Sequence, residues 1–349
     1  MFARKLNLPL LILPVLLFSI SYVTLQSTHK ELAASQLFYF IFGYFLYLII
    51  SGLPSDFFLK YWKALYIPTV VILFITVILG VERFGSSSWF KFGTFVVQPS
   101  EFAKISLIVA VAALICADTA KINSTKKLLN IGIASLSIIT LVLFQPDLGS
   151  ALVLVFVVIG MLFYSGLSKY FFIGAFVVLG ILSSPLWSLL QDYQKKRILV
   201  FLNPSLDVLG AGYNVTQSII AIGSGGLAGK GFEMGTQSHL GFLPVFWTDF
   251  IFASFAEEWG FIGILIFNLI YIFLLVYLLY LSKQVNTAFK SLVIVGVFFV
   301  FLVQYTINVG MNLGMLPVTG VTLPLVSYGG SSLLSSLILL GIVQAMCRK

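Results

Sequence analysis

One acidic residue, Asp249, lies where a long polar stretch gives way to an apolar run that continues to about position 282. A carboxylate at such a boundary can accept a proton from a bound hydroxyl group. A structural role is also possible, because Thr248 or Asp249 can cap the helix that follows. A helix N-terminus lowers the basicity of a carboxylate, whereas burial raises its pKa, and the sequence leaves this balance open.

Two further acids, Glu257 and Glu258, follow eight and nine residues later. On a continuous helix they fall about 80° and 180° from the Asp249 direction. Glu257 can therefore share a cavity wall with Asp249, whereas Glu258 faces elsewhere. Adjacent acids in an apolar helix need partners, and cations of nearby loops or helices are the simplest ones.

Two basic groups precede Asp249 in the polar stretch. Lys195, Lys196 and Arg197 can hold a pyrophosphate, for which arginine offers bidentate contacts, or they form a solvated charge run. Lys230 lies within the glycine-rich run 221–231. No strand–helix unit surrounds this run, and it lacks the residues of a phosphate-binding P-loop, so it indicates no nucleotide site. It forms either an anion-binding loop of bare amides or a compact turn.

Polar residues also occur within apolar runs. Glu101 and Lys104 are three residues apart and can pair on one helix face, as a structural pair or as part of a cavity wall, and the structural pair is favoured. The segment 312–328 is apolar but interrupted by proline and glycine. Irregular backbone at membrane depth is tolerated only against protein or a water-filled cavity, so this segment is expected to re-enter the membrane as the wall of a site.

The elements that position these residues follow from composition. The chain has 349 residues, of which 60% are hydrophobic and 9% charged, with a mean hydropathy of +1.08. Soluble proteins contain about 25% charged residues, so the class is an all-α polytopic membrane protein. The net charge of +8 is attributed to membrane topology rather than nucleic-acid binding, and Cys116 and Cys347 indicate neither a metal site nor a disulfide framework.

Apolar runs long enough to cross the bilayer predict about ten transmembrane helices. The expected spans are 7–25, 34–52, 64–81, 99–117, 128–144, 149–166, 170–190, 250–282, 289–311 and 329–347. The eighth is longer than a span needs and is expected to tilt or protrude. A single transmembrane domain over 1–349 would then carry a large extracytoplasmic loop, 191–249, between the seventh and eighth helices.

Orientation follows from the basic residues of the short loops. With both termini in the cytoplasm, the outer short loops carry only Lys30, Arg83 and Lys91. Apart from Lys104, which lies within a span, the remaining basic residues outside the long loop lie inside. Segments 82–98, 145–148, 191–249 and 312–328 then share the outer face.

Several motifs, in order along nearly the whole chain, resemble those of the SEDS (shape, elongation, division and sporulation) family of peptidoglycan glycosyltransferases. They include Gln98–Lys104, Gln145–Gly149, Gly210–Tyr213 with Gln217 and Ser218, Ala221–Gly231, Gly235–Ser238, Thr248–Phe252 with Glu257 and Glu258, and Leu323–Pro324 with Ser327–Ser331. The segment 316–320 is more similar to the elongation branch of the family than to its division branch.

The resemblance implies polymerisation of lipid II at the outer face of the bacterial cytoplasmic membrane during cell elongation, with undecaprenyl pyrophosphate as leaving group. It implies Asp249 as general base and a class B penicillin-binding protein transpeptidase as partner. The substrate-binding residues expected are Arg197, Lys230, Lys91, Glu101, Lys104, Glu257 and Ser327. A divalent cation, Mg²⁺ or Mn²⁺, can assist, although the sequence contains no dedicated metal cage.

Two positions depart from the family pattern. Ser88 replaces a common arginine before Trp89, so Arg83 or Lys91 must supply any charge needed there, and Val245–Trp247 replaces a polar triplet before Asp249. The alternative functions are a flippase for lipid-linked precursors and a non-catalytic scaffold of the wall-synthesis complex. A flippase requires coupling-ion sites near the membrane midplane, whereas the acids here gather at the outer face.

Overall fold

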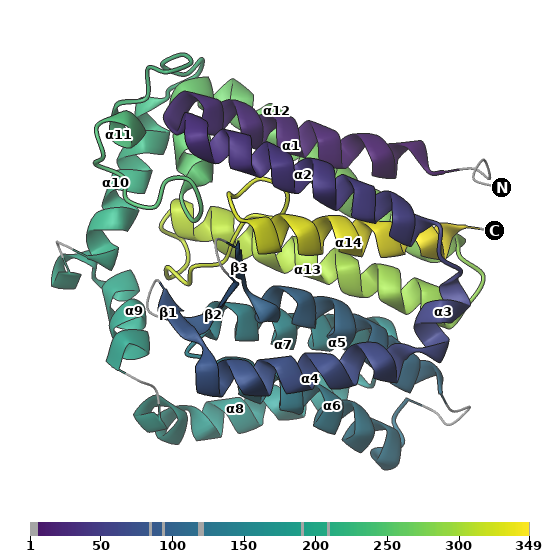
Figure 1. Ribbon diagram of the computed structural model, residues 1–349. Coiled ribbons are helices and arrows are strands. Elements are labelled where there is room, and N and C mark those ends of the chain that lie inside the picture. Colours follow the sequence, from purple (N-terminus) through teal and green to yellow (C-terminus); the bar gives the residue numbers. More distant parts are fainter. Residues whose placement is uncertain are drawn as a thin grey trace.

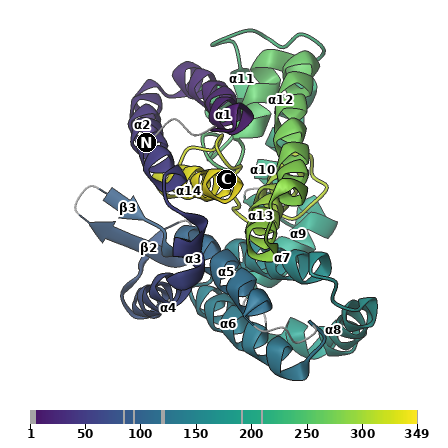
Figure 2. The same cartoon turned by 90° about the vertical axis from the view of Figure 1, so that its right-hand side faces the viewer.

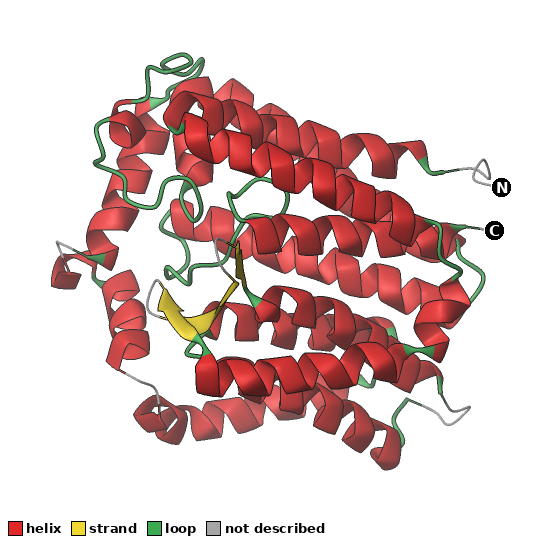
Figure 3. Ribbon diagram, in the orientation of Figure 1, coloured by secondary structure: helices red, strands yellow, loops and turns green. Residues whose placement is uncertain are grey.

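The computed structural model describes residues 6–83, 86–92, 95–117, 122–189, 192–207 and 210–348. Within these residues the chain is mostly helical, and three short strands lie together towards one end of the helical bundle (Figure 3). Both termini lie at the opposite end of the bundle (Figure 1). The all-α class predicted from composition is therefore confirmed.

Each of the ten predicted spans coincides with a helix. The helices are α1 (Leu8–Thr28), α2 (Lys30–Ser51), α4 (Trp62–Leu79), α5 (Pro99–Cys116), α6 (Thr125–Phe144), α7 (Leu148–Tyr164), α8 (Lys169–Leu189), α12 (Ile251–Gln284), α13 (Ala288–Asn312) and α14 (Gly330–Cys347). Among the described residues, 8 helices are long and apolar enough to cross a membrane, and α7 and part of α8 are shorter apolar helices. The exact number of spans stays a prediction.

The bundle is organised around α13. This helix contacts α5, α7, α12 and α14 and is buried along most of its length, while α14 lies against α2. The end-on view of Figure 2 shows α13 among these neighbours and α8 at the edge of the bundle. Residues of α13 can therefore contact both the segment that precedes α12 and the connection between α13 and α14.

The outer segments contain more regular structure than the sequence analysis expects. Segment 82–98 largely forms β2 (Ser86–Phe92) and β3 (Phe95–Val97), which pair antiparallel, and β1 (Val81–Arg83) pairs with β2. The expected loop 191–249 contains several helices, and α3 (Ser55–Lys60) lies between α2 and α4. The loop helices are α9 (Asp192–Leu202), the 3-10 helix η1 (Pro204–Asp207), α10 (Ala211–Ser224) and α11 (Thr236–His239).

The long helix α12 is broken at Gly260, where φ is 62° and ψ is −163°. The glycine-rich run supplies the hydrogen bonds that the break removes. The N–H groups of Lys230 and Gly231 donate to the carbonyls of Glu257 and Glu258, both at 3.0 Å. In return, the N–H groups at 261 and 262 donate to the carbonyls at 226 and 227. The compact-turn interpretation of the glycines is therefore correct, and these two amides bind carbonyls of α12 rather than an anion.

Gly229 is the position at which the contact between the glycine-rich run and α12 tolerates a side chain least. Its φ is +82°, and a Cβ there meets the backbone carbonyl of Glu258. We expect Gly229→Ala to lower the free energy of unfolding by more than the ~1–2 kcal/mol cost of left-handed backbone alone. Gly223→Ala is the matched control, because a Cβ at Gly223 meets nothing within 4 Å. Thermal unfolding of the detergent-purified variants measures the stability of both. Equal melting temperatures would contradict the close contact of Gly229 with α12.

Candidate active site

A cavity of about 160 Å³ lies at the outer end of the bundle, where several separate parts of the chain meet. Trp89 of β2, Asp147 at the start of α7, Arg197 of α9 and Asp249 before α12 all line it. The connection between α13 and α14 completes the wall, chiefly with threonine, serine, glycine and Tyr328. The re-entrant segment predicted from the sequence therefore does line a cavity.

Asp249 is held through its backbone by two asparagines of α13. The side-chain amides of Asn308 and Asn312 donate to the Asp249 carbonyl at 3.1 and 2.9 Å. Asn308 also donates to the carbonyl of Val321 at 2.8 Å. Both asparagines are fully buried. The same side chains therefore fix the position of Asp249 and the adjacent cavity wall.

The start of α12 does not use Asp249 as its cap. Phe250 occupies the N-cap position and has no side-chain cap hydrogen bond. Instead, the side-chain oxygen of Asn312 accepts from the N–H of Ala253 at 3.2 Å. The capping alternative for Thr248 and Asp249 is therefore wrong, because a residue distant in sequence provides the hydrogen bond that a local cap would have made.

The electrostatic surroundings of Asp249 favour a base of moderate strength. Burial raises the pKa of its carboxyl group from the usual 3.8 to about 6, against opposing contributions from a Thr248 hydrogen bond and the Arg197 charge. Burial is thus the larger of the two effects that the sequence left in balance. A group with this pKa is mostly ionised at neutral pH and still able to accept a proton.

Arg197 reaches the cavity from α9. Its Nη1 donates to the carbonyl of Thr319 at 3.2 Å, which ties α9 to the connection between α13 and α14. The exposed Lys196 instead forms an ion pair with Asp207 at 3.1 Å. Of the basic cluster 195–197, only the arginine lines the cavity. Its charge can stabilise an anionic group bound near Asp249.

Asp147 is a second carboxylate in the cavity, and the sequence analysis did not select it as a site residue. Its carboxylate accepts from Gln98 Nε2 at 3.0 Å, from Ser100 Oγ at 3.3 Å and from the N–H of Ser150 at 2.9 Å. It therefore caps α7 and orients Gln98, another cavity residue. The available signal was an isolated acid in a very short loop between two apolar runs.

Glu101 and Lys104 form the structural pair that the sequence favoured. The Lys104 Nζ lies 2.7 Å from Glu101 Oε2, and both side chains are buried. Gln304 accepts from Lys104 at 3.2 Å, and Ser335 donates to Glu101 at 2.8 Å. Neither member of the pair lines the cavity, so their expected role in direct substrate binding is not supported.

Lys230 and Glu257 also lie outside the cavity. They pair with each other at 2.6 Å, and Glu257, which is 0% exposed, also accepts from Thr236 Oγ1 and the N–H of Gln237. The prediction that Glu257 shares a wall with Asp249 is wrong, because Asp249 precedes the first helical residue and helical spacing does not apply to it. Lys230 and Glu257 instead fasten the glycine-rich run to α12.

Ser327 has a positioning role rather than the expected contact with substrate. Its hydroxyl donates to the carbonyl of Thr248 at 2.6 Å and accepts from the N–H of Leu323 at 2.8 Å. It is buried and does not line the cavity, although Tyr328 beside it does. Lys91 lies in β2, and its side chain falls outside the described residues.

The two roles considered for Lys230 predict different mutant behaviour. Lys230 is the partner of a fully buried carboxylate, so Lys230→Met is expected to lower the free energy of unfolding by roughly 3–5 kcal/mol. Glu257→Gln in the same chain should recover part of that loss, which a double-mutant cycle in thermal unfolding measures. Unchanged stability together with weakened phosphate binding would instead mean that Lys230 binds the substrate.

Sequence comparison places this geometry in a known family. Residues 3–349 match the model of the FtsW/RodA/SpoVE cell cycle proteins. The chain belongs to this family. Peptidoglycan glycosyltransferase MrdB of Escherichia coli K12 is 41% identical over 309 residues, which span 87% of this chain and 82% of the relative. The MrdB of Helicobacter pylori 26695 is 34% identical over 343 residues, 95% of this chain and 87% of the relative.

Other family members give the same picture. The probable peptidoglycan glycosyltransferase FtsW of Thiomicrospira cyclica is 36% identical over 315 residues, 86% of this chain and 78% of the relative. A chain from a structure described as "Structural coordination of polymerization and crosslinking by a peptidoglycan synthase complex" aligns with a TM-score of 0.85 at 29% identity, covering 99% and 98% of the two chains. An aspartate-to-alanine mutant of the rod shape determining protein RodA of Thermus thermophilus aligns with a TM-score of 0.75 at 28% identity, covering 99% and 98%.

Proposed function

We propose that this chain polymerises lipid II into glycan strands, with Asp249 as general base and undecaprenyl pyrophosphate as leaving group. The enzyme class rests on the relatives, which are named as peptidoglycan glycosyltransferases and align over most of their own length. The observation that carries the catalytic assignment is the half-buried carboxylate of Asp249 in an outer cavity, with a pKa of about 6 and Arg197 in the same wall.

The reaction follows from what these two side chains can do. Asp249 removes the proton from the acceptor sugar hydroxyl as its oxygen attacks the anomeric carbon of the donor. The bond between that carbon and the phosphate oxygen breaks, and the electron pair leaves with the pyrophosphate. Arg197 stabilises the negative charge that develops there. The backbone hydrogen bonds from Asn308 and Asn312 keep the base in position without occupying its carboxylate.

The proposed location is the bacterial cytoplasmic membrane, with both termini in the cytoplasm and the cavity facing outward. Two observations support it: the basic residues of the short loops favour this orientation, and both termini lie at the end of the bundle opposite the strands (Figure 1). A class B penicillin-binding protein is the proposed partner. Its support is the fold shared with a chain of a peptidoglycan synthase complex.

Mg²⁺ or Mn²⁺ stays part of the proposal only as an ion that binds together with the substrate. Within the described residues, no group of three or more His, Cys, Asp or Glu side chains could hold a metal ion. In the cavity, the Asp147 carboxylate already accepts three hydrogen bonds. These residues do not form a cage for an ion, so no step of the proposed reaction depends on one.

Asp249→Asn is the most direct test. Removing the base is expected to lower the rate of lipid II polymerisation by 10²-fold or more, with the folded protein retained. Glu233→Gln is the matched control, because Glu233 forms an exposed ion pair with Lys30 away from the cavity. Gel analysis of glycan made by the purified protein, alone and with its partner, measures both variants. Normal polymerisation by Asp249→Asn would overturn the mechanism.

The rate should also depend on pH in a way that identifies the base. Because Asp249 must be ionised to accept a proton, kcat/KM is expected to fall about tenfold per pH unit below its pKa, which lies at about 6. Arg197 lowers this pKa, so Arg197→Gln should move the acid limb to higher pH. Lys196→Gln, which removes an exposed charge paired with Asp207, should leave the limb in place. An acid limb at the same pH in the unsubstituted protein and in both variants would mean that the Arg197 charge does not act on the base.

A further inference from the structure

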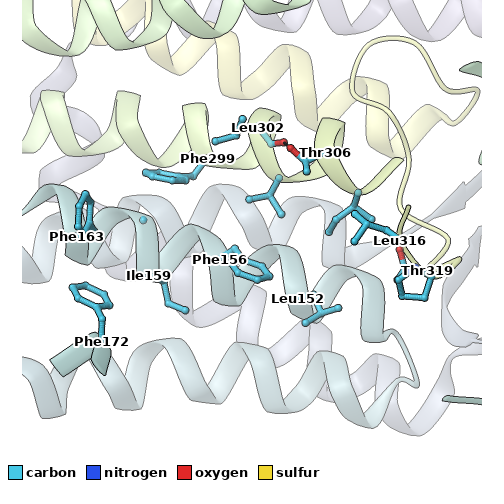
Figure 4. A pocket seen from close by; sticks show the side chains of 14 residues that line it. Leu152, Phe156, Ile159, Phe163, Phe172, Phe299, Leu302, Thr306, Leu316 and Thr319 are labelled. Carbon is cyan, nitrogen blue, oxygen red and sulfur yellow. Dashed lines mark hydrogen bonds between the residues drawn. The ribbon is translucent and has the colours of Figure 1, made fainter. Parts of the chain in front are cut away.

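The connection between α13 and α14 has two ends with different surroundings. At the α13 end, Leu316 and Thr319 line an apolar groove beside α7 (Figure 4). At the α14 end, residues 327–329 form hydrogen bonds with α2. Tyr328 and Gly329 also line the cavity that contains Asp249. Contacts with α2 therefore act on the wall of that cavity.

One buried side chain of α2, that of Gln36, forms these hydrogen bonds. It is 0% exposed, and both ends of its amide bind the same short segment. Its Nε2 donates to the carbonyl of Ser327 at 3.0 Å, and its Oε1 accepts from the N–H of Gly329 at 3.2 Å. A polar side chain inside a membrane helix is costly and calls for a specific reason. Glutamine supplies the donor and the acceptor that these two backbone groups require, without a charge.

The held segment is bonded in turn to the two residues before Asp249. The Ser327 hydroxyl donates to the carbonyl of Thr248 at 2.6 Å, and the N–H of Tyr328 donates to the carbonyl of Trp247 at 2.9 Å. The two asparagines of α13 bind the carbonyl of Asp249 itself. This stretch of backbone therefore has two supports, one on α13 and one, through the connection, on α2.

We propose that Gln36 is a positioning residue for the polymerisation reaction, because it fixes the cavity wall that orients Asp249. The inference rests on the proposed function. Gln36 does not line the cavity, so its replacement leaves the surface that meets the substrate in place. A base displaced from the acceptor hydroxyl transfers the proton more slowly, since general-base catalysis requires hydrogen-bond distance. The loss therefore falls on kcat rather than on KM.

Gln36→Met tests this assignment, because it removes both hydrogen bonds and keeps the length of the side chain. We expect kcat for lipid II polymerisation to fall by about tenfold or more, with KM within about twofold of the unsubstituted protein. Tyr47→Phe is the matched control. It removes a buried hydrogen bond between the same two helices, from the Tyr47 hydroxyl to Gln344 at 3.4 Å, and should leave kcat unchanged.

Equal kcat values in Gln36→Met and Tyr47→Phe would overturn the assignment. A higher KM at unchanged kcat would also overturn it, because Gln36 would then act on substrate binding. The proposed function fails separately, if the unsubstituted protein makes no glycan from the same lipid II.

Gln36→Glu gives a pH signature that a general loss of stability does not produce. An ionised carboxylate accepts from the N–H of Gly329 but cannot donate to the carbonyl of Ser327, whereas a protonated carboxyl group can do both. We expect the ratio of its kcat to that of the unsubstituted protein to rise as pH falls, in samples that circular dichroism shows to be folded. A ratio equal to that of Gln36→Met at every pH would contradict the proposal.

Hydrogen–deuterium exchange covers the case in which Gln36→Met does not fold. Gln36→Asn keeps the amide but shortens the side chain by one methylene group, so it cannot reach both backbone groups. In nanodiscs, we expect faster exchange at the N–H groups of Tyr328 and Gly329, and unchanged exchange in the half of α2 that contains Tyr47. Unchanged exchange at both N–H groups would mean that Gln36 does not hold the cavity wall.

Discussion

In a hydrocarbon environment every backbone N–H and C=O must find a partner within the protein, and this constraint explains most of the outer half of the molecule. Two of the segments that leave helical geometry there are the break in α12 at Gly260 and the connection between α13 and α14. The first is completed by the glycine-rich run, whose backbone approaches closely enough only because side chains are absent. The second is completed by buried side chains, among them Asn308 and Ser327.

The same hydrogen bonds shape the proposed active site. Asn308 and Asn312 bind the backbone of Asp249, and Ser327 binds the carbonyl of the residue before it. Structural demands therefore fall on the backbone, and the acidic side chain faces the cavity. If Asp249 is the base, as proposed, a carboxylate held in this way needs little reorganisation when the substrate binds, which is the property that electrostatic catalysis requires.

Charge is distributed on the same principle. The buried carboxylates of Glu101 and Glu257 each have a lysine partner and further hydrogen bonds. Such pairs are weak evidence for net stability. Removing one partner nevertheless leaves a buried charge unpaired and strongly destabilises the fold, so the pairs hold the elements around them in register. Glu101 and Lys104 connect α5 to α13 and α14 beneath the cavity, through Gln304 and Ser335. Arg197 differs from these lysines, because it lines the cavity that holds Asp249.

The sequence by itself determined the helical class, the approximate limits of the membrane helices and the place of Asp249 at the start of one of them. Apolar runs of sufficient length have few alternatives to a helix in a membrane, and a lone acid at a helix boundary stands out against them. It also favoured the Glu101–Lys104 pair, because partners three residues apart on one helix are a local property.

Only the tertiary structure decided which polar residues meet. Ser327 takes its partners from Thr248 and Gln36, and Asn312 caps a helix that begins far away in sequence. The sequence analysis expected Lys230 and Glu257 at the substrate site, whereas they form a structural pair. The reason is that the glycine-rich run hydrogen-bonds to α12 beside the break at Gly260, and that Asp249 lies outside the helix. Such contacts depend on how helices pack across the bundle, and a pattern of neighbouring residues carries no record of that packing.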